Sequence, residues 1–156
     1  DKVFVFACNW CSYAGGDMAG ISRIKYPSTN RVVRTMCSAR VSEEMVLEAF
    51  RCGAPVVLVS GCHYADCHYI DANRQTVKRM QKLWNKLEKA GVRPERLQLE
   101  WISAAEGQKF AKVMGQMEEK RQLVTADEIA HAREALKPKK KRVAKKKPAQ
   151  AKEARA

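Results

Sequence analysis

The chain has 156 residues, of which 46% are hydrophobic, and a formal net charge of +13. This size suits one domain with a core that needs no disulfide bonds, and no apolar run reaches the roughly 18 residues of a membrane-spanning helix. Positions 137–156 hold ten Lys or Arg and one acidic residue, so +9 of the charge belongs to this tail and only +4 to the first 136 residues.

Strand and helix signals begin close to the N-terminus. Residues 3–7, V-F-V-F-A, predict a buried first strand, and the glycine-bearing stretch 8–20 is expected to be a long loop. Residues 31–36 predict a second strand. Ser42 is a favourable N-cap before two glutamates, so a helix is expected over 43–52, with the glycine that follows as its stop.

The same alternation continues through the second half. The apolar run 55–60 is typical of a central parallel strand that is covered on both faces. An apolar stripe at helical spacing predicts a helix over 71–90, and residues 97–102 predict a fourth strand. Two capping-box patterns predict helices over 103–117 and 125–136.

Strands that alternate with helices predict an α/β fold. We expect a small parallel four-stranded sheet with flanking helices, a flavodoxin-like arrangement, followed by a C-terminal helix and a basic tail. The expected division is an α/β domain over 1–118, a helical extension over 119–136 and the basic tail over 137–156.

Five of the six cysteines lie at or just beyond the ends of three predicted strands: Cys8, Cys11, Cys37, Cys62 and Cys67. Sites in open parallel sheets form beyond the carboxyl ends of the strands. We therefore expect these thiols to form one site. Cys52 falls at a helix end without a cysteine nearby in sequence, and we expect it to be an ordinary buried thiol.

Four interpretations of the cysteines compete. An iron–sulfur cluster commonly takes four thiolates, and the C-x-x-C and C-x₄-C pairs plus the single Cys37 offer five. A structural zinc site also takes cysteine ligands, although these are not the spacings of a zinc ribbon. Cys8 and Cys11 alone match a thiol–disulfide motif, which leaves the other thiols unexplained. The last alternative is a set of buried, unreactive cysteines.

Polar and aromatic neighbours surround the cysteines. His63 and His68 are either ligands of a mixed centre, hydrogen-bond donors to its sulfurs, or solvated side chains. Asp66 either accepts a hydrogen bond near the site or caps the following helix. Trp10 and Tyr13 either shield the centre from water or are ordinary packed aromatics. His131, in the late helix, is expected at the surface.

Four motifs in order resemble the delta subunit family of methyl-viologen-reducing hydrogenase over about residues 3–115. The tail beyond about residue 120 lies outside the resemblance. The motifs are C-N-W-C-S-Y-A-G-G-D-M-A-G, M-C-S-A-R-V, G-C-H-Y-A-D-C-H-Y and L-E-W-I-S-A-A-E-G-Q-K-F.

The resemblance implies an iron–sulfur protein with one 2Fe–2S cluster, held by four of the five clustered cysteines, that relays electrons without substrate chemistry of its own. It implies as partners the flavin subunit of a heterodisulfide-reductase-like complex and a hydrogenase, formate dehydrogenase or methylene-tetrahydrofolate reductase module. The chain shows no nucleotide-binding glycine fingerprint.

Three alternatives are open for the basic C-terminal tail. The tail is either solvated without a fixed role, docked on an acidic partner, or bound to nucleic acid; it has no aromatic residue for base stacking, so nucleic acid is not the expected partner. The late helix, 125–136, is expected to pack on a neighbouring subunit.

The chain opens on a predicted strand and shows no export signal, which favours a cytoplasmic location. Because the chain begins at Asp1, we expect an initiator Met or a short N-terminal stretch to be missing.

Overall fold

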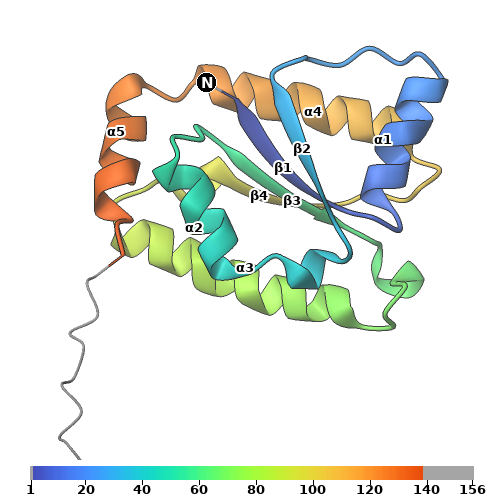
Figure 1. Ribbon diagram of the computed structural model, residues 1–156, viewed down its shortest axis with the longest axis horizontal. Coiled ribbons are helices and arrows are strands. Elements are labelled where there is room, and N and C mark those ends of the chain that lie inside the picture. Colours follow the sequence, from blue (N-terminus) through green and yellow to red (C-terminus); the bar gives the residue numbers. More distant parts are fainter. Residues whose placement is uncertain (1, 139–156) are drawn as a thin grey trace, which may run out of the picture.

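Four parallel strands form one sheet in the order β2-β1-β3-β4 (Figure 1). The computed structural model describes residues 2–138, and the basic tail beyond Pro138 lies outside them. The strands are β1 (Val3–Cys8), β2 (Asn30–Thr35), β3 (Val57–Gly61) and β4 (Leu97–Trp101). This confirms the expected four-stranded parallel α/β fold, with each strand close to its predicted position.

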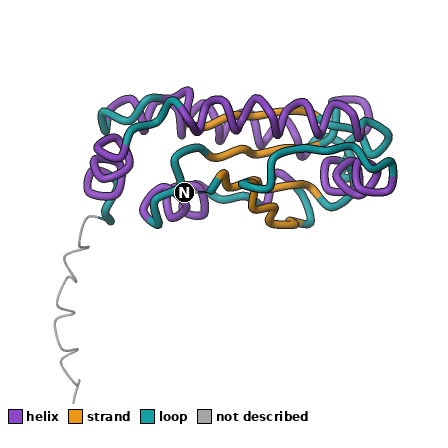
Figure 2. Tube along the Cα trace, turned by 90° about the horizontal axis from the view of Figure 1, so that it is seen from above, coloured by secondary structure: helices purple, strands orange, loops and turns teal. Residues whose placement is uncertain are grey.

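Helices cover both faces of the sheet, which lies between them in Figure 1; Figure 2 gives the same arrangement from above. On one face lie α1 (Ser12–Ile21) and α4 (Gly107–Gln122); on the other lie α2 (Glu43–Arg51) and α3 (Ala72–Lys89). The last helix, α5 (Ala126–Ala135), packs beside α2. The two central strands are covered on both sides, which explains their continuous apolar runs.

Each face of the sheet has its own core, because successive side chains of a strand point to opposite faces. The core on the α2 and α3 side includes Phe6, Val57, Val59, Leu97, Leu47, Phe50, Met80 and Leu83. The core on the α1 and α4 side includes Val3, Val5, Ala7, Leu58, Ala19, Phe110, Val113 and Met114.

The expected loop over 8–20 is wrong, because α1 occupies most of it. Its glycines permit close packing. A Cβ added to Gly15 would lie 2.8 Å from the Ser103 carbonyl oxygen, and one added to Gly16 would lie 3.0 Å from the Phe110 ring. Glycine usually weakens a helix, but here the missing side chains let α1 approach α4 and the end of β4.

Two of the three predicted helix N-caps are present in the structure. Ser42 accepts a hydrogen bond from Met45 N at 3.2 Å, and Thr125 and Glu128 form the full capping box of α5. At the third position, Ser103 N donates to Glu106 Oε2 at 2.7 Å, but α4 begins only at Gly107. The helix ends at Gln122 and not at residue 117, because its buried positions extend to Met117. It therefore runs across the expected domain boundary at residue 118.

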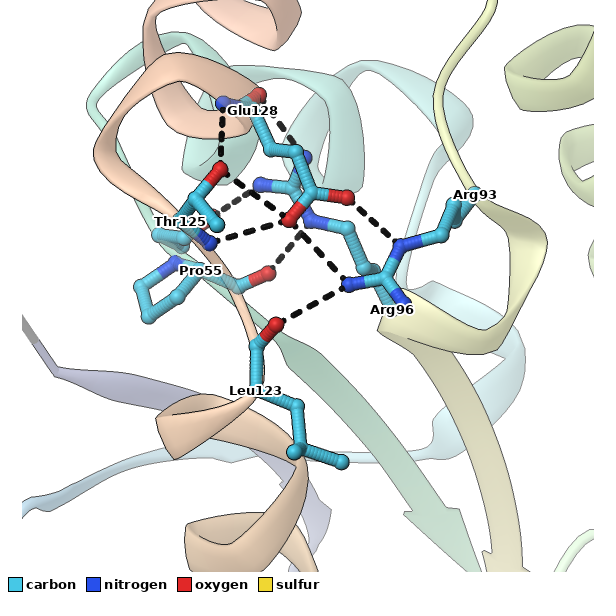
Figure 3. Close-up of polar contacts among 7 residues, drawn as sticks. Pro55, Arg93, Arg96, Leu123, Thr125 and Glu128 are labelled. Carbon is cyan, nitrogen blue, oxygen red and sulfur yellow. Dashed lines mark hydrogen bonds and ion pairs between the residues drawn. The ribbon is translucent and has the colours of Figure 1, made fainter.

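A buried arginine attaches α5 to the sheet (Figure 3). Arg96 is 3% exposed, and its guanidinium donates to the carbonyl oxygens of Pro55 (2.6 Å), Ala54 (3.2 Å) and Glu128 (3.0 Å). Arg93 forms an ion pair with the Glu128 carboxylate at 2.6 Å. Burial lowers the pKa of Arg96 below its ordinary value. The helix expected to pack on a neighbouring subunit thus has a face buried on its own domain.

Candidate metal centre

Three sulfur atoms converge at the carboxyl edge of the sheet. Cys8 ends β1, Cys11 directly precedes α1, and Cys62 directly follows β3. Their Sγ atoms all lie within 4.8 Å of one another, and those of Cys8 and Cys62 are 3.8 Å apart. All three residues are buried, so side chains from distant parts of the sequence form one water-poor thiol cluster.

Ser12 fixes the backbone beneath the cluster. Its hydroxyl oxygen accepts a hydrogen bond from Cys8 N at 2.9 Å, and the hydroxyl donates to Ser60 O at 3.1 Å. Ser12 is fully buried. One side chain at the start of α1 therefore connects the ends of β1 and β3, which carry Cys8 and Cys62.

The absence of a side chain at Gly61 brings a further segment close. A Cβ added there would lie 2.7 Å from both Ser38 Oγ and Trp101 Cζ3. The Ser38 hydroxyl in turn hydrogen-bonds Thr76 of α3 at 2.9 Å. The segment that contains Cys37 is held against β3 because Gly61 leaves room for it.

The two remaining candidate thiols differ in their surroundings. Cys67 is partly buried and packs against the cluster of Cys8, Cys11 and Cys62. Cys37 is buried, but its Sγ accepts a hydrogen bond from Ala39 N at 3.4 Å and is not one of the three convergent sulfurs. Three sulfurs thus converge and Cys67 packs against them, while Cys37 lies outside this group but close enough to Cys8 and Cys67 for their charges to raise its pKa.

The cluster thiols perturb one another's ionisation. Hydrogen bonds from Cys11 and Cys62, in that order, hold the pKa of Cys8 at about 2, far below its ordinary value of 9.0. The pKa of Cys11 is raised by its interactions with Cys62 and Cys8 and by burial. For Cys62, the hydrogen bond with Cys11 favours the thiolate, but its interaction with Cys8 and its burial outweigh this and raise its pKa to about 11.

The mutual interactions therefore lower the pKa of Cys8 and raise the pKa values of Cys11 and Cys62. A metal that bound all three sulfurs would displace the protons of Cys11 and Cys62. Burial raises the pKa of Cys37 as its largest effect, and the Ala39 N–H opposes this.

Two polar side chains hold the loop after β3. Asn73 is buried and donates from Nδ2 to the carbonyl oxygens of Cys62 (3.2 Å) and His63 (3.0 Å), while its Oδ1 has no hydrogen-bond partner within the described residues. Glu106 Oε2 lies 2.7 Å from His63 Nε2. The Ser103 N–H and then His63 lower the pKa of Glu106. His63 is thereby engaged by a carboxylate.

Of the other predicted neighbours, Trp10, Asp66 and His68 are exposed, whereas Tyr13 is partly buried and packs against the core on the α1 and α4 side. The Trp10 indole stacks on the His68 ring, with 3.7 Å between centroids and an angle of 12° between the planes. Asp66 is exposed and does not cap α3, whose N-cap is Asp71. His131 is exposed, as expected, and hydrogen-bonds to Ala90 O at 3.1 Å.

One cysteine prediction is wrong, and three polar contacts at the site were not predicted. Cys52 is exposed, against the expected burial, and its thiol lies 3.7 Å from Glu48 Oε1. Sequence reasoning did not identify Ser12, Asn73 or the Glu106 contact with His63, since a lone polar residue shows no pattern until its tertiary partner is known.

The arrangement fits tetrahedral thiolate coordination. A metal–sulfur bond of about 2.3 Å gives an edge of about 3.8 Å between ligand sulfurs of a tetrahedron, which is the distance between Cys8 and Cys62. Thiolates suit both zinc and iron–sulfur centres. The fold and this edge define the chain as an α/β protein with a cysteine-rich candidate metal centre.

Comparisons with known proteins narrow this class. The family model described as "Methyl-viologen-reducing hydrogenase, delta subunit" matches residues 3–124. The iron-sulfur subunit of an F420-non-reducing hydrogenase from Archaeoglobus profundus is 49% identical over 113 residues, which cover 72% of this chain and 82% of that protein. The chain belongs to the methyl-viologen-reducing hydrogenase delta subunit family.

Other relatives carry the same unit within a longer polypeptide. One subunit of the ferredoxin/F420H2-dependent CoB-CoM heterodisulfide reductase of Methanosarcina acetivorans is 51% identical over 114 residues, which cover 73% of this chain but only 14% of that protein. The corresponding protein of Methanosarcina mazei, from a ferredoxin:CoB-CoM heterodisulfide reductase, is 52% identical over 112 residues, again 14% of its length. This chain therefore spans about one seventh of these relatives. Within residues 2–138, no helix is long and apolar enough to cross a membrane.

Proposed function

We propose that this chain is an electron-transfer subunit that carries one 2Fe–2S cluster. The observation that carries the proposal is the convergence of buried cysteine sulfurs at one edge of the sheet. Relatives that this chain largely covers are named iron-sulfur subunits, which favours iron and sulfide over zinc.

The cluster ligands in this proposal are Cys8, Cys11, Cys62 and Cys67. The first three have convergent sulfurs, and Cys67 packs directly against them. Cys37 is the thiol left over in this assignment, because its sulfur is not one of the three that converge and the residue is not part of the packed thiol cluster. Four thiolates are the usual complement of a 2Fe–2S cluster.

In this proposal the protein holds the cluster in a fixed position and limits its contact with water. A bound 2Fe–2S cluster supplies a carrier for a single electron. Ser12 and Asn73 fix the two backbone segments that bear the cysteines, and the buried thiols limit contact with water. Rigid placement and low solvent exposure are the means by which a protein tunes the potential of such a centre.

The proposed partners follow from the names of the relatives together with the family resemblance of the sequence motifs. Their names refer to hydrogenases and to heterodisulfide reductase. We propose a relay between a hydrogenase, formate dehydrogenase or methylene-tetrahydrofolate reductase module and the flavin subunit of a heterodisulfide-reductase-like complex. A cytoplasmic location belongs to the same proposal.

Metal analysis of anaerobically purified protein tests this function. We expect two iron atoms and two acid-labile sulfides per chain, and an EPR signal after reduction by dithionite. Zinc without iron would contradict the proposal and indicate a zinc-binding module. A protein without metal, in which Cys8 and Cys11 form a reversible disulfide, would indicate a thiol oxidoreductase instead.

A further inference from the structure

Strand β2 forms one edge of the sheet, because it pairs only with β1. Asn9 N donates to Thr35 O, and alternate residues of a parallel strand face the same neighbour, so the odd-numbered residues of β2 turn their backbone groups towards β1. The N–H and C=O groups of Val32 and Arg34 therefore point outwards. Among residues 2–138, none forms a hydrogen bond with these four groups. They are free to pair with a further strand.

The opposite edge of the sheet, β4, is less open. No residue of β4 is exposed, and Trp84 Nε1 of α3 donates to Leu97 O at 2.9 Å. In β2, by contrast, Arg31, Val32 and Arg34 are all exposed. Strand β2 is thus the edge at which another strand has access to the sheet.

An apolar groove lies on the α2 face of the sheet beside this edge. Phe4 and Phe6 of β1 line it together with Met45 and Ala49 of α2, and its volume is about 610 Å³. Both phenylalanines are direct neighbours of β2 residues in the sheet register. A second hollow of about 470 Å³, next to Thr35, adjoins the groove at Met45. Alternate side chains of an added strand would point to this face, where apolar side chains are favoured.

The edge is strongly basic. Residues 18–42 contain five basic side chains and no acidic one, and all five are exposed: Arg23, Lys25, Arg31, Arg34 and Arg40. None of them belongs to an ion pair among the described residues. A segment that carries carboxylates would therefore find partners along the whole strand.

The same features disfavour two other occupants. A second copy that paired through its own β2 would place two basic stretches side by side, which like-charge repulsion opposes. A nucleic acid has no backbone that continues a sheet, and its phosphates would meet the exposed carboxylates of Glu44 and Glu48 in the groove. Charged side chains on an edge discourage most strands from pairing, but an acidic strand is attracted by these arginines.

We propose that β2 and the groove beside it are the docking site for an extended, acidic segment of a partner protein, which joins the sheet as a fifth strand. Its main chain bonds to the outward groups of Val32 and Arg34, its carboxylates pair with the basic side chains, and its apolar side chains face the groove. In this kind of recognition the main chain gives affinity and the side chains give specificity. The inference goes beyond the proposed function and does not involve the cysteines.

A proline substitution tests the backbone contact. Val32→Pro removes an N–H that the pairing with β1 does not use, and proline is tolerated at such an edge position. The probe is a fluorescein-labelled peptide of about ten residues in which Glu and Val alternate, titrated with the full chain and followed by fluorescence anisotropy. We expect Val32→Pro to weaken binding at least about tenfold, and Val32→Ala, which keeps the N–H, to change it less than about threefold.

Charge reversal tests the side-chain contact without changing the backbone. Arg31→Glu combined with Arg34→Glu should weaken peptide binding at least about tenfold. The matched control is Lys78→Glu combined with Lys82→Glu, which makes the same change of charge at exposed positions of α3 and should leave the affinity within about threefold. All variants keep the basic tail, so binding through the tail would not distinguish them. Equal affinities across these variants would overturn the proposal.

Amide hydrogen exchange, measured by NMR, locates the added strand. The amides of Val32 and Arg34 should exchange rapidly in the free chain and become protected by the peptide, whereas those of Arg31 and Val33, which face β1, should be protected in both states. If the Val32 and Arg34 amides stay unprotected at saturating peptide, no strand is added and the proposal fails.

The other two occupants have their own signatures. A wild-type dimer in analytical ultracentrifugation that Val32→Pro converts to a monomer would assign the edge to a second copy and overturn the proposal. A single-stranded DNA oligonucleotide that displaces the peptide, and binds wild-type chain and Val32→Pro equally, would assign it to nucleic acid and overturn it as well.

Discussion

His63 Nε2 and Glu106 Oε2 lie 2.7 Å apart and join the loop that bears Cys62 and Cys67 to the start of α4. The same carboxylate oxygen accepts a hydrogen bond from Ser103 N at 2.7 Å. Glu106 thus positions the loop without contact with a sulfur atom.

Removal of this carboxylate should loosen the loop. We expect Glu106→Ala to lower the free energy of unfolding by about 1–2 kcal/mol, because the Ser103 N–H and the His63 ring both lose a partner. Urea unfolding of the metal-free chain measures this. Glu106→Gln retains an amide oxygen as acceptor, so its free energy of unfolding should fall by less. Equal losses of stability in the two variants would show that the acceptor oxygen does not stabilise the loop.

Single serine substitutions should separate the five thiols. Cys67→Ser is expected to lose or distort the cluster, because Cys67 packs against the convergent sulfurs. Cys37→Ser should retain wild-type iron and sulfide, since the Cys37 sulfur is not one of the convergent sulfurs. Iron analysis and EPR provide the readout, and a cluster lost in Cys37→Ser would remove our ligand assignment.

Gly61→Ala should be destabilising. The added Cβ would lie 2.7 Å from Ser38 Oγ and from the Trp101 ring, so the segment with Cys37 must shift. We expect a loss of about 1–3 kcal/mol, typical of overpacking. Gly20→Ala in α1 is the matched control, because nothing lies within 4 Å of its added Cβ, and it should stabilise by about 0.5–1 kcal/mol. Thermal unfolding of both variants compares them.

Arg96→Met should destabilise the attachment of α5. The substitution removes donors from the buried carbonyl groups of Pro55 and Ala54, and we expect a cost of about 2–4 kcal/mol. Arg93→Met is the control: its side chain is half exposed, so loss of its ion pair with Glu128 should cost less than about 1 kcal/mol. Similar costs in denaturant unfolding would argue against a special role for the buried guanidinium.

The stability contributed by Glu118 should depend on pH. Its pKa is lowered from 4.5 to about 2, first by the hydrogen bond from Arg121, with a smaller contribution from the Thr29 hydroxyl. A folded-state pKa below the unfolded value stabilises the fold above about pH 4.5, and this is lost as the pH falls towards 2. Glu118→Gln should cost about 1 kcal/mol at pH 7 and progressively less below pH 4.5 in urea unfolding. A constant difference would exclude the charge as its source.

The layout of the fold could be predicted because local patterns and global topology agree. Apolar runs such as 55–60 mark central strands whatever their neighbours, and parallel strands necessarily bring Cys8 and Cys62 to one edge. The α1 helix was missed because Gly15 and Gly16 indicate a loop when taken alone. Their use at a helix contact depends on Ser103 and Phe110, about ninety residues further along.

The details of the candidate site depend on tertiary contacts that sequence patterns do not record. Five thiols were predicted to gather, but only packing distinguishes Cys67, which touches the convergent sulfurs, from Cys37, which does not join them. Ser12 and Asn73 act through hydrogen bonds to backbone groups of other elements, and no spacing rule identifies such bonds in advance.

Arg96 and the cysteine cluster occupy opposite edges of the sheet: the arginine directly precedes β4, whereas Cys8 and Cys62 lie at the ends of their strands. The end of α5 therefore lies away from the edge that carries the cysteines. A unit with this polarity can be joined to a larger polypeptide, or carry a purification tag after α5, while the edge that bears the cysteines stays accessible. The two Methanosarcina relatives, in which the matching segment makes up 14% of the protein, are natural counterparts of such a splice.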